Sequence, residues 1–235
     1  MTPLTKKKWR CIELPQTGYR TAWKLQTDLV AARNDRRVET DIVLLLEHPP
    51  VFTLGRRGGL ENLTVAEDIL KDRGIPIIQV ERGGNITFHG PGQLVIYPIV
   101  DLKSARLGVV DYVGMLEEVV IRVAADWGIT SDRNPLNRGV WVGDRKLASI
   151  GVAVRRGISF HGVALNVNLS IEPFTWINPC GLKGIGVTSL EMELGGSLPI
   201  DPVRKAVKRH LGEVFGVELV MTEIEELRNC QLKLS

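Results

Sequence analysis

Two side chains of this sequence, Cys180 and Lys146, have the type and the surroundings that nucleophilic catalysis uses. Cys180 lies in Asn178-Pro-Cys-Gly181, where turn-forming residues favour an exposed thiol on a fixed backbone. The thiolate is the reactive form, so such a thiol needs a nearby base or cation. Lys146 opens the run Lys-Leu-Ala-Ser-Ile-Gly-Val and thus brings an amine into a strand whose other residues are apolar or small. His89 and His161 are further candidates for that role.

Each of these residues also has an ordinary structural interpretation. A single cysteine in an intracellular chain is most often a small buried hydrophobe. Lys146 could belong to the exposed turn Gly143-Asp-Arg-Lys, and both histidines could serve as structural supports. Cys11 and Cys230 lack comparable surroundings and receive no role.

The stretch from Arg82 to Pro98 concentrates four glycines, at positions 83, 84, 90 and 92, in what reads as a loop between two strands. Glycine is needed where φ is positive or where another group must touch the main chain. Such a loop suits a bound ligand, and a pair of tight turns without a ligand is the alternative.

Composition limits the class of protein. The chain has 235 residues, 44% of them hydrophobic and 24% charged, which is typical of a globular protein with a real core. Without a linker-like segment, residues 1–235 are expected to form a single catalytic domain. No apolar run could span a membrane and no signal-type segment follows the N-terminus, so we expect a cytoplasmic protein with no membrane partner.

The sequence lacks the signals of several common partners and cofactors, namely nucleic acids, metals and nucleotides. The net charge of +3 is too small to indicate nucleic-acid binding, although the pairs Arg56/Arg57 and Arg155/Arg156 could attract an acidic protein or simply be solvated. The scattered cysteines and histidines form neither a disulfide framework nor a metal-ligand spacing. A P-loop and a dinucleotide fingerprint are also missing, so neither a metal nor another cofactor is expected.

The predicted elements alternate irregularly. Helical spacing of apolar residues predicts helices near residues 21–33, 64–74, 109–127 and 203–214, the second of them with a capping box of Thr64 and Glu67. Strands are expected over 41–47, 51–54, 77–81, 94–99, 139–142, 146–154 and 159–166, with consecutive hairpins in the second half. This order predicts an α/β (α+β) fold with a mixed, partly antiparallel central sheet flanked by helices.

Several motifs in a fixed order together resemble the bacterial octanoyltransferases of lipoate synthesis. The resemblance covers roughly residues 42 to 215. The matching motifs are Arg82-Gly-Gly with Thr87, His89-Gly90, Gly92-Gln93, Tyr97-Pro98, Lys146-Leu-Ala-Ser-Ile-Gly151, His161-Gly-Val-Ala-Leu-Asn166, Asn178-Pro-Cys-Gly181 and Val187-Thr-Ser-Leu190.

The resemblance implies a reaction, partners and a fold. An octanoyl group would move from octanoyl-acyl carrier protein to a lysine of lipoyl domains, namely those of the 2-oxoacid dehydrogenase complexes and of the glycine cleavage H protein. It would pass through a thioester on Cys180, with Lys146 as its partner, and would need no ATP. The fold would be that of the lipoate and biotin protein ligases.

The resemblance also implies a set of substrate-binding residues. An apolar slot would read acyl length by its depth, since about 0.8 kcal/mol is gained per buried methylene. Main-chain N–H groups, either near Cys180 and Gly181 or in a turn at 149–151, would stabilise the oxyanion. The implied substrate-binding residues are Arg82, Gly83, Gly84, Asn85, Ile86, Thr87, Phe88, His89, Ser149, Ile150, Gly151, Gly162, Val163 and Ala164.

Three other functions remain open from the sequence. An ATP-dependent lipoate or biotin ligase would tolerate the glycine-rich loop, but it does not need a cysteine. A thioesterase or amidase would use the same cysteine and lysine and pass the acyl group to water. A carrier-protein binding module would use the basic pairs and have no use for Cys180.

Overall fold

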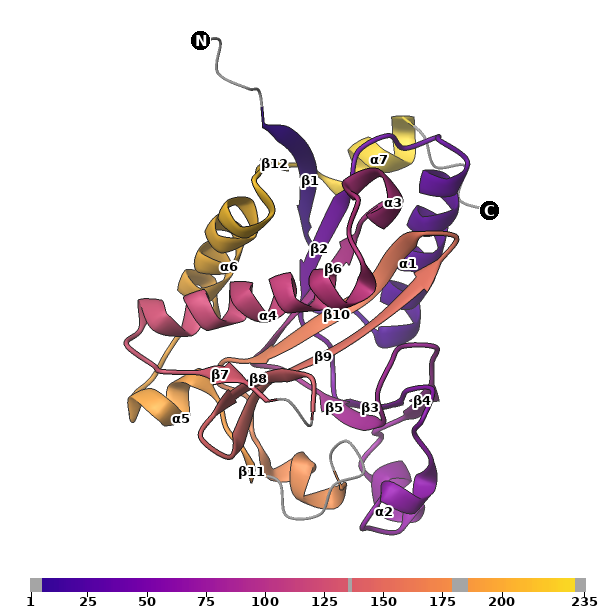
Figure 1. The fold of residues 1–235 in the computed structure, drawn as a ribbon. Coiled ribbons are helices and arrows are strands. Elements are labelled where there is room, and N and C mark those ends of the chain that lie inside the picture. Colours follow the sequence, from indigo (N-terminus) through magenta and orange to yellow (C-terminus); the bar gives the residue numbers. More distant parts are fainter. Residues whose placement is uncertain (1–5, 135–136, 179–185, 231–235) are drawn as a thin grey trace.

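The structure, a computed structural model, describes residues 6–134, 137–178 and 186–230 (Figure 1). Its centre is one sheet in the order β12-β1-β2-β6-β10-β9-β8-β7, with β11 paired to β9 beside that path. Pairing is parallel within β12-β1-β2 and between β11 and β9, and antiparallel elsewhere. The expected mixed, partly antiparallel sheet is therefore confirmed. Its strands are β1 (Lys7–Glu13), β2 (Ile42–Leu46), β6 (Gln93–Ile99), β7 (Asp132–Arg133), β8 (Gly139–Val142), β9 (Arg145–Arg155), β10 (Ile158–Asn166), β11 (Gly186–Val187) and β12 (Val217–Met221).

Helices cover both faces of this sheet (Figure 1). The long helices α4 (Val109–Asp126) and α6 (Ile200–Phe215) pack on one face, and α1 (Tyr19–Asn34) with α7 (Ile224–Cys230) packs on the other. All five residues of β2 are buried, as its unbroken apolar run predicts for a strand covered on both sides. The short helices α3 (Leu102–Ala105) and α5 (Leu190–Leu194) complete the covering layers.

A second, three-stranded sheet stands beside the first and carries the glycine-rich stretch. Its order is β4 (Ile77–Gln79), β3 (Val51–Leu54) and β5 (Ile86–His89). The expectation of one continuous loop from residue 82 to the strand at 94 is thus wrong, because Ile86–His89 pairs antiparallel with β3. The elements around this sheet are α2 (Glu67–Asp72) and the 3₁₀ helices η1 (Leu60–Asn62) and η2 (Glu172–Trp176).

The predicted capping box at Thr64 is also wrong. Helix α2 begins at Glu67, and its N-cap residue Ala66 has no side chain that could cap it. Thr64 instead donates its backbone N–H to the carbonyl of Trp176 at 2.8 Å and its hydroxyl to the carbonyl of Thr175 at 3.1 Å. Hydrogen bonds to a distant segment have replaced the local cap, which the sequence pattern alone does not reveal.

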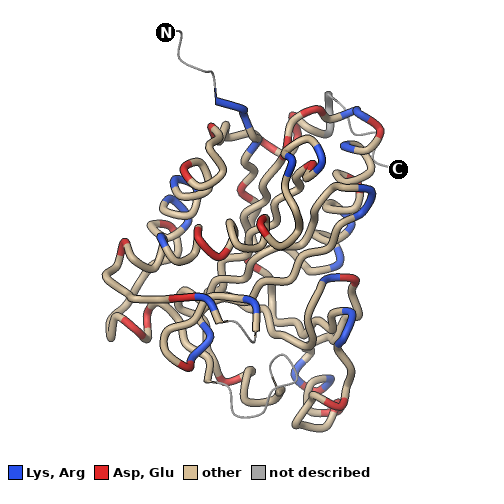
Figure 2. Tube along the Cα trace, in the orientation of Figure 1, with Lys and Arg blue, Asp and Glu red and all other residues tan. Residues whose placement is uncertain are grey.

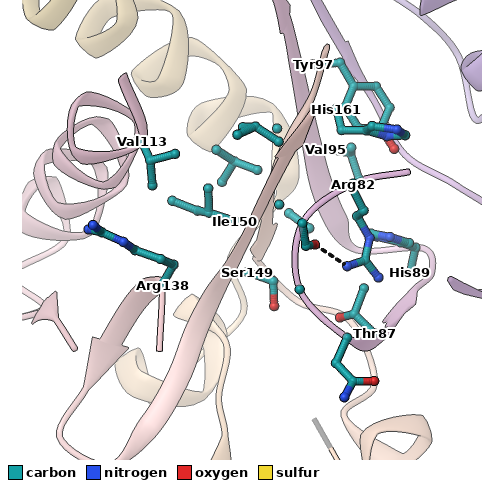
Figure 3. Close-up of a pocket in the computed structure, with 18 of the residues that line it drawn as sticks. Arg82, Thr87, His89, Val95, Tyr97, Val113, Arg138, Ser149, Ile150 and His161 are labelled. Carbon is teal, nitrogen blue, oxygen red and sulfur yellow. Dashed lines mark hydrogen bonds between the residues drawn. The ribbon is translucent and has the colours of Figure 1, made fainter. Parts of the chain in front are cut away.

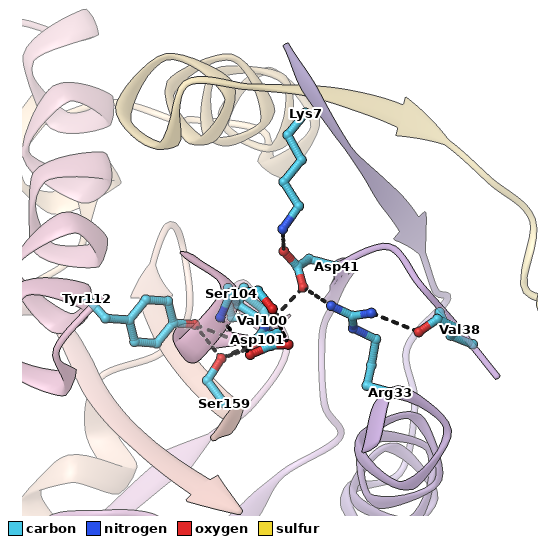
Figure 4. Close-up of polar contacts among 10 residues, drawn as sticks. Lys7, Arg33, Val38, Asp41, Val100, Asp101, Ser104, Tyr112 and Ser159 are labelled. Carbon is cyan, nitrogen blue, oxygen red and sulfur yellow. Dashed lines mark hydrogen bonds and ion pairs between the residues drawn. The ribbon is translucent and has the colours of Figure 1, made fainter. Parts of the chain in front are cut away.

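A buried ion-pair network joins α1 to the start of β2 (Figure 4). The fully buried Asp41 accepts hydrogen bonds from Arg33 Nη2 and Lys7 Nζ, both at 2.6 Å, and from the backbone N–H of Asp101 at 3.0 Å. Arg33 also donates to the carbonyl of Val38. Each charge in the network has a partner, as burial of charged groups requires.

Candidate functional site

A cavity of about 570 Å³ opens where the Arg82–His89 stretch meets β9, β10 and the start of α4. In Figure 3, Val113, Arg138 and Ile150 lie on one side of the view, and Arg82, His89 and His161 lie on the other. The lining residues are Tyr19, Arg57, Arg82, Gly83, Gly84, Asn85, Ile86, Thr87, His89, Val95, Tyr97, Val109, Val113, Asn137, Arg138, Lys146, Ser149, Ile150, Gly151, Val152, His161, Gly162, Val163 and Ala164.

All the residues predicted to bind substrate line this cavity except Phe88. The ring of Phe88 packs instead against Phe52 and Phe174, with ring centroids 5.1 and 5.7 Å apart. Side chains alternate along a strand, so β5 turns Thr87 and His89 towards the cavity and Phe88 away from it. Phe88 therefore supports the small sheet from behind and does not line the cavity.

Lys146 is buried, with only 4% of its surface exposed, and its side chain reaches the cavity. Its Nζ donates to Asn137 Oδ1 at 3.0 Å and lies 5.2 Å from the centre of the Trp141 ring. Its backbone is held on both sides, because β8 pairs Trp141 with Lys146 and β11 pairs Val187 with Lys146. The alternative of an exposed turn lysine is therefore wrong.

A β-bulge in β9 explains how this amine can leave an apolar strand on the cavity side. Pairing with β8 shifts register between Val140, opposite Ala148, and Trp141, opposite Lys146, so Leu147 is the extra residue. Leu147 and Ala148 both lie in the apolar core under α4, while Lys146 and Ser149 both line the cavity. The bulge thus re-aims Lys146 relative to simple alternation, a use of bulges that is frequent beside active sites.

Aromatic and histidine side chains form the opposite end of the cavity. His48 donates from Nδ1 to the carbonyl of Thr17 at 2.6 Å, so its Nε2 accepts the Tyr97 hydroxyl at 2.8 Å. Burial lowers the pKa of His48 to about 4, and burial raises the pKa of the nearby Tyr19 to about 12. These groups are therefore neutral near pH 7.

His89 begins a chain of buried hydrogen bonds that runs to Lys146. Its Nδ1 lies 2.7 Å from Gln93 Oε1, and Gln93 Nε2 donates to Asn166 Oδ1 at 2.9 Å. Asn166 then donates to the carbonyl of Thr188, whose backbone N–H donates to the carbonyl of Lys146. Burial is the main cause that holds the pKa of His89 well below its ordinary value. The second cause is repulsion from the charge that His48 carries when it is protonated. A continuous chain of hydrogen bonds thus links His89 at one end of the cavity to the backbone of Lys146 at the other.

His161 has a strained backbone. Its φ of 56° lies in the left-handed region, and its N–H donates to Gln26 Oε1 at 2.7 Å, which helps hold that conformation. The imidazole is buried, with Nδ1 3.5 Å from the Tyr19 hydroxyl and Nε2 3.8 Å from a Glu81 carboxylate oxygen. Burial lowers the pKa of His161 as well.

Cys180 lies outside the described residues, but the residues on either side of its segment are firmly attached to the cavity. Asn178 donates its N–H to the carbonyl of Asn62 at 2.7 Å, and Asn62 in turn donates to Asn85 Oδ1, which lines the cavity. On the other side, Val187 pairs with Lys146.

Some lining residues were not predicted from the sequence. Asn137 and Arg138 lie in an irregular segment whose residue types carry no pattern that points to a site, and Arg57 was named only as half of a basic pair. Val109 and Val113 were assigned to the apolar stripe of a helix. Such a stripe does not show that the start of the helix borders a cavity. Tyr97 belongs to a motif that the family resemblance already used, so the sequence did hold a usable signal for it.

Among the described residues, no group of three or more His, Cys, Asp or Glu side chains is arranged to hold a metal ion. No helix in the same part of the chain is both long and apolar enough to cross a bilayer.

Comparison with known proteins gives a consistent family. Residues 18–212 match the family model "Lipoyl protein ligase A/B catalytic domain". Octanoyltransferases of Desulfotalea psychrophila and Syntrophobacter fumaroxidans are 44% and 45% identical to this chain, over 92% and 93% of it and 98% and 96% of their own length.

Solved structures with low sequence identity share the fold. A putative lipoate protein ligase from T. acidophilum with bound lipoic acid has a TM-score of 0.74 at 18% identity, covering 94% of this chain and 95% of its own. A lipoate-protein ligase A bound with ATP also scores 0.74, at 18% identity, covering 96% and 95%. The chain therefore belongs to the lipoyl protein ligase A/B catalytic-domain family, in which its curated relatives are octanoyltransferases.

Proposed function

We propose that this chain is an octanoyltransferase, which moves an octanoyl group from the thiol of octanoyl-acyl carrier protein to a lysine of lipoyl domains. The observation that carries this proposal is the buried Lys146 amine at one end of a cavity with apolar walls. Relatives of this name at 44% and 45% identity support it, because the chain spans nearly their full length. The fold, with residues 1–235 as one catalytic domain, is then the scaffold of the cavity.

The cavity has the size and lining that a medium-length acyl chain needs. Valine and isoleucine side chains from β6, β9, β10 and α4 line it, and glycines let the main chain come close to a ligand. Burying seven carbons of an octanoyl group gives roughly 5 to 6 kcal/mol before ordering costs. Arg82, Asn85, Thr87 and His89 then contact the acyl chain from the Arg82–His89 side, and Ser149 and Ala164 contact it from β9 and β10.

Cys180 is proposed as the nucleophile that carries the acyl group. It follows Asn178 by two residues, so covalent geometry keeps the two Cα atoms within about 7 Å. Because Asn178 is bonded to Asn62 and Asn62 to Asn85, this limit supports a thiol near the cavity. The pairing of Val187 with Lys146 supports the same placement from the other side.

Lys146 is proposed to act on both half-reactions. Its ammonium stabilises the thiolate that attacks the incoming thioester, and it then protonates the leaving pantetheine thiolate. The resulting amine accepts a proton from the lysine of the lipoyl domain as that lysine attacks the acyl-enzyme. Because a thioester is exchanged for a thioester, the first step needs no ATP.

The partners follow from this reaction. The donor is octanoyl-acyl carrier protein, and the acceptors are lipoyl domains of the 2-oxoacid dehydrogenase complexes and the glycine cleavage H protein, in the cytoplasm. Arg57 and Arg138 line the cavity and are exposed, so they can meet an acidic donor. Elsewhere charges of both signs are spread over the chain (Figure 2), so the attraction is local.

The test is transfer through an acyl-enzyme. Wild-type protein mixed with octanoyl-acyl carrier protein and no acceptor should gain one octanoyl mass, located on Cys180 by peptide mass spectrometry. Cys180→Ala should fold, gain no mass and transfer nothing, while Cys11→Ala, which changes a buried cysteine outside the cavity, should behave as wild type. Full transfer by the Cys180→Ala protein would end the proposal.

An ATP-dependent lipoate ligase is the second candidate, because a ligase structure with bound ATP shares this fold. It predicts that free octanoate and ATP yield an acyl-adenylate and pyrophosphate with this protein. Our proposal predicts neither product. Release of pyrophosphate that depends on octanoate would favour the ligase.

A further inference from the structure

Glu117 is a charged residue on the buried side of α4. It is 0% exposed, whereas most of the other buried residues of this helix are apolar, Leu116, Val120 and Val123 among them. Burial of a carboxylate costs free energy unless hydrogen bonds and ion pairs compensate for it. A glutamate at this place therefore calls for an explanation beyond packing.

The Glu117 carboxylate joins α4 to the segment that leads into β8. Its Oε1 accepts the backbone N–H of Gly139 at 3.1 Å. Its Oε2 lies 3.5 Å from Arg138 Nη1 and 3.5 Å from Arg133 Nε, and both arginines are exposed. One buried carboxylate thus contacts the first residue of β8 and the residue before it.

The same segment carries a partner of the Lys146 amine. Asn137, two residues before Gly139, accepts from Lys146 Nζ through its Oδ1 at 3.0 Å. The carbonyl of Asn137 accepts from Trp141 Nε1 at 3.2 Å, and the Trp141 ring centre lies 5.2 Å from the same Nζ. Lys146, Asn137 and Trp141 therefore form one unit. The hydrogen bond from Gly139 to Glu117 attaches this unit to α4.

Helix α4 also forms part of the cavity wall. Val109 and Val113 line the cavity, and Glu117 follows them at the same spacing of four positions, so the three side chains lie along one face of the helix. The attachment is close to the amine, since a Cβ at Gly139 would lie 2.8 Å from Lys146 Cε and 3.5 Å from Nζ. One helix thus carries both a wall of the cavity and the attachment of the amine.

We propose that Glu117 is a positioning residue, which fixes the Lys146 amine relative to the cavity through Gly139 and Asn137. The inference rests on the proposed function, in which Lys146 takes a proton from the attacking lysine of the lipoyl domain. A group that takes a proton must lie within hydrogen-bond reach of it. A misplacement of about 1 Å can cost about 100-fold in rate. Glu117 does not line the cavity, so its loss should affect kcat and not substrate binding.

The first experiment compares Glu117→Gln with Glu118→Gln. Glu118 is the matched control, because it is the next residue of α4 and its partners among the described residues are Arg122 and Arg133. Glutamine at position 117 keeps the size of the side chain. Its NH2 group would face guanidinium groups or a backbone N–H, so it cannot keep all the contacts of the carboxylate.

Octanoyl-pantetheine serves as the donor, because Arg138 could also affect binding of a carrier protein. We expect kcat to fall about 10-fold or more for Glu117→Gln with little change in KM, and neither constant to change for Glu118→Gln. An unchanged kcat in folded Glu117→Gln protein, a loss confined to KM, or equal losses in both variants would refute the role.

The second experiment asks whether Glu117 acts through Asn137. Asn137→Ala removes the Oδ1 that accepts from Lys146, so it should lower kcat as well. If the two residues act in series, the protein with both changes should lose no more than Asn137→Ala alone, because residues that work as a unit have non-additive effects. Losses that multiply would show independent roles and overturn the inference.

The third experiment does not depend on octanoyl transfer. Acetic anhydride in limiting amount acetylates the amines, and peptide mass spectrometry compares the yield at Lys146 with that at the exposed Lys205. We expect a several-fold higher relative yield at Lys146 in Glu117→Gln than in the wild type or Glu118→Gln, because the amine is no longer held beside Asn137. Equal yields in the three proteins would overturn the inference. A wild type that transfers no octanoyl group would contradict the proposed function instead.

Discussion

Lys146 illustrates how much surrounding structure one functional side chain requires. An amine buried this deeply needs acceptors, and Asn137 Oδ1 supplies one at 3.0 Å while the Trp141 ring supplies another favourable contact. Asn137 is itself kept in place two residues before Gly139, whose N–H is bonded to Glu117. These contacts hold the amine in one orientation towards the cavity. A fixed orientation suits a catalytic role better than a role in which the amine only balances a charge.

We predict that Lys146→Arg loses at least about 100-fold in turnover, because a guanidinium keeps the charge but does not release a proton near neutral pH. Steady-state transfer of octanoyl groups measures this. The control is Arg145→Lys, a neighbouring exposed residue paired with Glu193, which should leave turnover unchanged. Near-normal turnover of the Lys146→Arg variant would leave Lys146 with an electrostatic role only.

Elements with strong local patterns could be predicted, and those set by distant contacts could not. The stripe of apolar residues in α4 and the run in β2 identified both elements because burial dictates their composition. Strand β5 was missed because its glycine-rich flanks read as a loop, and only pairing with β3 makes it a strand. The bulge at Leu147 has no signature in the sequence, so Lys146 was recognised by its apolar and small neighbours and by its family motif, and not by its geometry.

At the scale of the β8–β9 hairpin, we predict that Gly139→Ala abolishes most activity. A Cβ there would lie 2.4 Å from the Ala148 carbonyl oxygen and would displace the Lys146 side chain. We expect a loss of about 2 kcal/mol in unfolding free energy and about 100-fold in turnover, measured by urea unfolding and transfer assays.

Gly143→Ala is the matched control in the same hairpin. Its φ of 59° is also positive, but nothing lies within 4 Å of the added Cβ. It should cost about 1 kcal/mol of stability and leave turnover intact. Similar losses of turnover in both variants would mean that hairpin stability, and not the place of Lys146, limits activity.

In the whole molecule, two polar centres lie beyond opposite ends of β2. Asp41 and its partners precede the strand, and His48 follows it by two residues. The two residues are seven positions apart in the sequence, which corresponds to roughly 23 Å of extended chain. The first centre joins α1 to strands β1 and β2 of the sheet (Figure 4), while the second borders the cavity. Stability and function should therefore respond separately to changes at the two centres.

We predict that Asp41→Asn lowers the free energy of unfolding by about 3 kcal/mol, since it leaves the buried Arg33 without its counter-charge. Urea unfolding measures the loss. The KM for octanoyl-acyl carrier protein should remain that of the wild type below the unfolding transition. A matching rise in KM would show that the two centres are coupled.

Acid should destabilise the fold through the histidines beside the cavity. The pKa of His48 is about 4 in the folded protein, against about 6.5 when unfolded. Between these values the unfolded chain binds a proton that the folded one does not, so stability falls as pH drops from about 6.5 to about 4, by about 1.4 kcal/mol per pH unit. Above this pH range, the titration of His48 no longer changes the free energy of unfolding.

Unfolding free energies of wild type and His48→Gln at pH 7.5, 6 and 5 measure that contribution. The glutamine variant should show a shallower pH dependence over this interval. Proton NMR titration of the His48 ring in the folded wild type should give a midpoint near 4. A midpoint near 6.5 would contradict the assignment.

Glycines supply part of the cavity wall at Gly83, Gly84, Gly151 and Gly162. A residue without a side chain cannot be shortened, so substitution at these positions can only narrow the space. A redesign for bulkier or longer acyl groups must therefore shorten the larger side chains of the lining. Val113 of α4 and Ile150 of β9 are two positions where a smaller residue creates room.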